Sequence, residues 1–145
     1  MSFLLYLCIT KMEKQFIPYT EALALKKLEF DEKSLGWYCN DMNILYANMY
    51  NGNAIEVEIN YPPQPKQLSC YAPLWQQAFD FFNEKFKLAS HVDIFAQTNL
   101  GDNYYYQIVN FADVISPETT VQVYGFKTSY DAKLACLKKL ITYLQ

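Results

Sequence analysis

His91 and Asp93 are the residues whose types and spacing best suit acid–base chemistry. They stand two positions apart in the segment HVDIFAQ, so in a strand their side chains point to the same face. A histidine beside a carboxylate can serve as a general base. His91 is the only histidine, so any Ser-His-Asp or Cys-His arrangement would have to use it. The alternative interpretation is an ordinary histidine at the start of a strand, near a helix end.

Glu56 and Glu58 form a pair of carboxylates in the alternating segment AIEVEIN. Two carboxylates on one face can share a proton or hold a divalent cation. The alternative is that both glutamates lie on the solvent-exposed face of a half-buried antiparallel strand. The sequence offers no third ligand for this pair, so we expect neither a metal nor a cofactor.

Aromatic residues concentrate in two segments, NYYYQIVNF at 103–111 and TVQVYGF at 120–126. Alternation puts Tyr104 and Tyr106 on one face of a strand and Tyr105 on the other, so at least one tyrosine is exposed. Exposed aromatic side chains are enriched in protein interfaces and can stack on planar ligands. The competing explanation is ordinary cross-strand packing. The predicted binding surface comprises Tyr104, Tyr105, Tyr106, Tyr124 and Phe126, with Tyr124 and Phe126 expected on the same face.

Lys133, Lys138 and Lys139 either contact an anionic partner or form a solvated helix face. The 145 residues include twelve lysines and no arginine, and the net charge is −3. Readers of duplex nucleic acid usually carry a basic surface with arginines. We therefore expect no duplex nucleic acid among the partners of this acidic chain.

The sequence contains no phosphate-binding glycine motif and no C-x₂-C motif. Its four cysteines, Cys8, Cys39, Cys70 and Cys136, are each 31 or more residues from the next, a spacing that favours reduced thiols. No apolar run approaches the length of a membrane span, so we expect no membrane association and a cytoplasmic protein. Residues 1–11 are interpreted as an N-terminal extension with translation starting at Met12; the alternative is an edge strand or a tail.

The elements that must position these residues follow from periodicity and turn signals. We predict an α+β fold in the order α-β-β-β-α-β-β-β-α, with mostly antiparallel sheet and three amphipathic helices on one face. Residues 12–145 are expected to form one domain. The proline-rich segment 61–73 is expected to be a connection without regular structure. Helices are predicted over 18–30, over 73–88 and from Thr128 or Ser129 onward, and strands over 34–40, 44–50, 54–60, 91–97, 103–111 and 120–126.

Three segments together resemble a family of small uncharacterised proteins of bacteriophages and mobile elements: FIPYTEALALKKLEFDEKSLGWY at 16–38, APLWQQAFDFFNEKFKL at 72–88 and TSYDAKLACLKKLITYL at 128–144. Asp131-Ala132 stands where the family often has two glutamates. The resemblance brings no catalytic residue with it.

Two function classes remain for a chain that we expect not to be an enzyme. The first is a host-directed interaction protein or inhibitor, for which acidic charge and exposed aromatic side chains are suited. The second is a protein that sequesters a small nucleotide-like signal of host defence, in which case a homo-oligomer is expected. A weaker third alternative is an enzyme that relies on Glu56 and Glu58.

Overall fold

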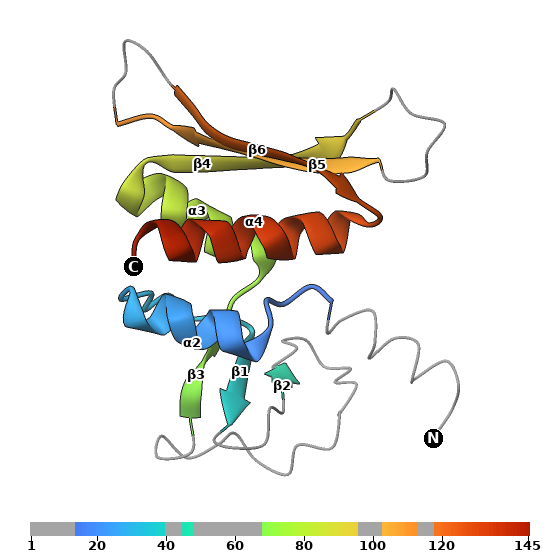
Figure 1. Cartoon of the computed structure of the whole chain (residues 1–145). Helices are drawn as coiled ribbons and strands as arrows, with labels where there is room; N and C mark the ends of the chain where they lie inside the picture. Colours follow the sequence, from blue (N-terminus) through green and yellow to red (C-terminus); the bar gives the residue numbers. More distant parts are fainter. Residues whose placement is uncertain (1–13, 40–44, 48–67, 96–102, 113–117) are drawn as a thin grey trace, which may run out of the picture. The chain divides into compact units, whose positions relative to one another are not determined.

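The computed structural model describes residues 14–39, 45–47, 68–95, 103–112 and 118–145 (Figure 1). The chain divides into two compact units, Met1–Trp75 and Gln76–Gln145. The expected strand over 54–60, with Glu56 and Glu58, and the expected extension 1–11 lie outside the described residues. That residues 12–145 fold as one domain stays a prediction.

The first unit combines helix α2 (Tyr19–Lys27) with a three-stranded antiparallel sheet in the order β2-β1-β3. Its strands are β1 (Gly36–Cys39), β2 (Leu45–Ala47) and β3 (Leu68–Ala72). The helix ends where Glu29 adopts a φ of 67°, and the amide of Phe30 then donates to the carbonyl of Leu25. This is the Schellman geometry, which supplies partners for the last carbonyls of a helix.

Strand β3 corrects the expectation that segment 61–73 has no regular structure. It pairs with β1 from Ala72 opposite Gly36 to Leu68 opposite Cys39. The reason is that the prolines of this segment flank residues 68–72, so the five amides between them are free to join a ladder. The hydroxyl of Tyr38 also donates to the carbonyl of Ile17 at 2.7 Å, which ties β1 to the segment before α2.

Helix α3 (Trp75–Phe86) belongs to the second unit from Gln76 onward and confirms the amphipathic helix expected over 73–88. Ala78, Phe81 and Phe82 are buried on it. The helix stops at Phe86 because Lys87 has a φ of 58°, which no α-helix accommodates. Strand β4 (Leu88–Ile94) follows at once, three residues earlier than the expected start at position 91. His91 therefore lies in the middle of a strand, which corrects the interpretation as a strand-start histidine.

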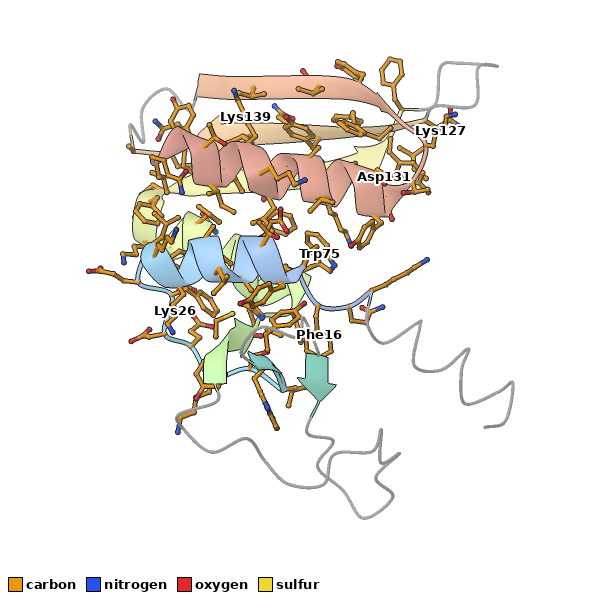
Figure 2. The ribbon with its side chains drawn as sticks, turned by 60° about the horizontal axis from the view of Figure 1, so that its bottom comes forward. Phe16, Lys26, Trp75, Lys127, Asp131 and Lys139 are labelled. Atoms are coloured by element: carbon orange, nitrogen blue, oxygen red, sulfur yellow. The ribbon has the colours of Figure 1, made fainter. Side chains whose placement is uncertain are left out.

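Strands β4, β5 (Tyr104–Asn110) and β6 (Glu118–Phe126) form an antiparallel sheet in that order, and helix α4 (Ser129–Tyr143) packs on it. In Figure 1, α3 and α4 lie on the same side of this sheet. Helix α4 starts as predicted, because the Thr128 side chain accepts a hydrogen bond from the amide of Asp131. Figure 2 shows Asp131 at this end of the helix. The architecture is α+β with antiparallel sheets, as the sequence predicts.

Candidate functional site

The sheet of the second unit has two different faces. Its inner face, toward α4, carries buried side chains such as Tyr106 and Ile108. The neighbours of these residues along β5, Tyr105 and Gln107, point to the opposite face because side chains alternate along a strand. Cross-strand pairing extends this outer face to β4 and β6. We define the outer face by the following residues: Ala89, His91, Asp93, Phe95, Tyr105, Gln107, Val109, Gln122 and Tyr124.

Three rings meet at one end of the outer face, and we call Phe95, Tyr105 and Tyr124 the aromatic cluster. Tyr105 and Tyr124 stand opposite each other and stack, with ring centroids 5.4 Å apart and an interplanar angle of 27°. The ring of Phe95 packs edge-on against both tyrosines, with its centroid 5.2 Å from that of Tyr124 and 6.5 Å from that of Tyr105. Tyr124 remains 51% exposed and Phe95 37% exposed. The cluster therefore presents aromatic ring surface to solvent. Tyr105 comes from β5, Tyr124 from β6, and Phe95 directly follows β4.

A one-residue irregularity at Gly125 corrects the expectation that Tyr124 and Phe126 share a face. Tyr124 pairs with Tyr105, and Phe126 pairs with Tyr104, so Gly125 is an extra residue between them. Its φ of 95° is one that glycine adopts without strain, and an extra residue of this kind is a β-bulge. The bulge turns Phe126 to the inner face, where its ring lies 5.7 Å from that of Tyr106.

The five predicted surface residues are consequently divided between the two faces. Tyr105 and Tyr124 lie on the outer face, as an exposed aromatic surface requires. Tyr106 is buried, and Tyr104 and Phe126 are half-buried on its side of the sheet. Phe95 belongs to the outer cluster but was not among the predicted residues. The sequence does indicate the face on which Phe95 lies, because His91, Asp93 and Phe95 are at alternate positions of one segment.

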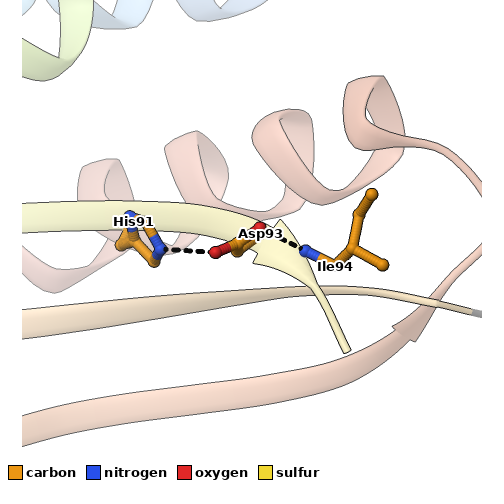
Figure 3. A network of polar contacts seen from close by, with 3 residues as sticks. All are labelled: His91, Asp93 and Ile94. Carbon is orange, nitrogen blue, oxygen red and sulfur yellow. Dashed lines mark hydrogen bonds and ion pairs between the residues drawn. The ribbon is translucent and has the colours of Figure 1, made fainter. Parts of the chain in front are cut away.

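His91 and Asp93 do share a face, as their spacing predicts, and they border the aromatic cluster. The imidazole Nε2 of His91 lies 3.3 Å from Oδ2 of Asp93, and Oδ1 of Asp93 accepts from the amide of Ile94 at 2.7 Å (Figure 3). The hydrogen bond from the Ile94 amide, and after it that from His91, lowers the pKa of the Asp93 carboxyl. The His91 ring also meets that of Tyr105 at 6.3 Å. The result is an ionised carboxylate next to exposed rings.

The remaining candidates lie elsewhere. Lys133, Lys138 and Lys139 belong to α4, not to the strands of the outer face, and Lys139 is labelled in Figure 2. Cys136 is a buried free thiol, and burial raises its pKa to about 12. Within the described ranges, no three His, Cys, Asp or Glu side chains are grouped to hold a metal ion.

Comparison of the chain with protein-family models, with curated proteins and with solved structures gives no match. Among the helices described, none has the length and apolar character to cross a bilayer. The resemblance to small phage and mobile-element proteins stays a prediction.

Proposed function

We propose that this chain is a non-catalytic interaction protein that binds another protein through the outer face of the β4-β5-β6 sheet. The observation that carries the proposal is the aromatic cluster, in which Phe95 and Tyr124 keep large exposed fractions. Tyrosine and phenylalanine are enriched at protein interfaces, and tyrosine in particular among the residues that dominate binding energy. In keeping with the resemblance to phage proteins, the proposed role is that of an accessory protein that binds a host protein in the host cytoplasm.

The charge of the outer face favours a protein over a nucleotide-like ligand. Stacked Tyr105 and Tyr124 offer planar surfaces that suit a nucleobase as well as an aromatic side chain. A nucleotide also carries phosphate, which proteins bind with cations or backbone amides. Strands β4, β5 and β6 contain no lysine, and Asp93 next to the rings would repel an anion. Sequestration of a nucleotide signal is therefore the second candidate.

Two surface tyrosines make a matched test of the proposal. Tyr124 on the outer face and Tyr143 on α4 are 51% and 50% exposed. The full chain is used to capture proteins from the host background, and the main candidate is then purified and titrated by calorimetry. We expect Tyr124→Ser to weaken this complex about tenfold or more, and Tyr143→Ser to leave it unchanged.

The same titration separates the two candidate functions. A saturable complex with the purified protein that depends on Tyr124 supports the proposal. Stacking of adenosine monophosphate on the chain, lost in Tyr124→Ser, would instead favour the nucleotide alternative. A protein complex that is equally tight in the Tyr124→Ser variant would exclude the outer face as the interface.

A further inference from the structure

Among the described residues of the outer face, Asp93 places a negative charge at the border of the aromatic cluster. Asp93 stands directly opposite Tyr105 in the strand pairing, two residues before Phe95 on the same face. Its carboxylate side chain is 58% exposed, although it contacts His91 and the Ile94 amide. An exposed carboxylate next to Tyr105 and Phe95 thus combines ionic and aromatic recognition in one place.

Cations are the ligands that such a combination recognises. The ring faces of tyrosine and phenylalanine attract ammonium and guanidinium groups, and arginine more often than lysine. A carboxylate adds an ion pair, and a guanidinium can form two parallel hydrogen bonds with it. An anion or a second carboxylate would be repelled at the same position.

The three strands that form the outer face carry no lysine or arginine. The sequences of β4, β5 and β6 are LASHVDI, YYYQIVN and ETTVQVYGF, which contain no lysine or arginine. The whole chain has no arginine and a net charge of −3. A guanidinium group on this face would therefore have to come from another molecule.

We infer that the outer face docks an arginine-bearing segment of a basic partner protein, with guanidinium groups seated against the aromatic cluster beside Asp93. This inference rests on the proposed function, because it specifies the chemistry of the partner that the outer face binds. The long, planar side chain of arginine fits a flat sheet face better than a compact ammonium does, since it can lie along exposed rings.

A peptide titration tests the inference without knowledge of the partner. The probe is the peptide acetyl-(Arg-Gly)₃-amide, added to the ¹⁵N-labelled full chain at pH 8. The control peptide replaces arginine by citrulline, which has nearly the same shape but no charge. We expect saturable shifts at residues 91–95, 105 and 124, with binding about tenfold weaker for citrulline.

Matched variants locate the site. Asp93→Asn and Tyr124→Ser should each weaken arginine-peptide binding about threefold or more, whereas Glu84→Gln on α3 and Tyr143→Ser on α4 should not change it. The amide spectrum of each variant shows whether its fold is intact. Equal binding of the citrulline peptide, or an unchanged affinity in Asp93→Asn, would overturn the inference.

Two further results separate a protein partner from other outcomes. Arginine amide alone should bind much more weakly than the peptide, and equal affinity would indicate a small cationic ligand and contradict protein docking. In the purified complex, dependence on Tyr124 without dependence on Asp93 would end this inference and leave the proposed function standing. Dependence on neither residue would end both.

Discussion

Tyr105 and Tyr124 face each other across β5 and β6 on the outer face, and their rings stack with centroids 5.4 Å apart. Cross-strand aromatic pairs of this kind stabilise a sheet beyond the area that they bury. The same pair thus contributes to the stability of the sheet and to the surface proposed for binding.

A double-mutant cycle on these two tyrosines should measure their interaction. We expect Tyr105→Ala and Tyr124→Ala to be coupled by about 0.5–1 kcal/mol in the free energy of unfolding, because each ring loses its partner in either single variant. Urea denaturation of the four proteins gives the value. Additive effects of the two substitutions would show that the stacked arrangement contributes no stability of its own.

Gly125 should be sensitive to backbone strain but not to crowding. A Cβ atom at this position has no neighbour within 4 Å, whereas the φ of 95° is unfavourable for any other residue. We expect Gly125→Ala to lower the free energy of unfolding by about 1 kcal/mol, and Gly125→Asn to cost less because asparagine tolerates positive φ better. Urea denaturation tests this order, and equal stability of all three proteins would contradict it.

Thr128 should stabilise the start of α4. Its Oγ1 accepts from the Asp131 amide at 3.1 Å and donates to Oδ2 of Asp131 at 2.7 Å. Removing the hydroxyl in Thr128→Ala should cost about 1 kcal/mol, whereas Thr128→Ser should retain most of the stability. Thr142→Ala is the control, because the Thr142 hydroxyl donates to the carbonyl of Lys138 one turn earlier in the helix, and the loss of such a bond should be nearly neutral. Thermal denaturation compares the four proteins.

Asp93 should make the protein lose stability as the pH falls into the acid range. Its folded pKa is lowered first by the Ile94 amide and then by His91, so the folded state favours the carboxylate. The stabilisation is present above the pKa of the unfolded carboxyl and is lost as the pH falls through the lower pKa of the folded state. Thermal midpoints measured downward from about pH 5 should therefore fall more steeply for the wild type than for Asp93→Asn. Parallel curves would show that these hydrogen bonds do not favour the ionised form.

Cys136 should make the protein lose stability as the pH rises into the basic range. Burial raises its pKa from 9.0 to about 12, so the folded state holds the thiol proton after the unfolded state has lost it. Stability is therefore full below the unfolded pKa and declines as the pH rises toward the folded one, by at most about 1.4 kcal/mol per pH unit. Cys136→Ala should remove this part of the slope, which urea denaturation from pH 8 to 11 measures as the difference between the two proteins. Iodoacetamide should leave Cys136 unmodified in the native state, and rapid alkylation there would contradict its burial.

The parts of the fold that depend on local patterns could be predicted from the sequence. The apolar stripe of α3 and the Thr128 cap of α4 are set by residues within one or two helical turns. Tyr105 and Tyr106 point to opposite faces simply because side chains alternate along a strand.

The errors arise where pairing partners distant in the sequence decide the outcome. The prolines of segment 61–73 leave residues 68–72 able to form a strand, but the partner β1 that makes strand β3 form cannot be identified from this segment. An isolated glycine in a strand pattern can indicate a β-bulge. That Gly125 forms one is established only by the pairing of β6 with β5. Alternation along its own segment puts Phe95 on the face of His91 and Asp93, but its contacts with the rings of Tyr105 and Tyr124 on two other strands could not be predicted from that segment.

The bulge has a consequence for how chains of this kind can change length. Because Gly125 is unpaired in the register with β5, its deletion would leave Tyr124 opposite Tyr105 and Phe126 opposite Tyr104. A relative one residue shorter at this point would therefore keep the same outward and inward rings, and its alignment with this chain should open a gap at position 125. Deletion of a paired residue such as Val123 would instead place Tyr124 opposite Tyr106 and so move its ring to the inner face.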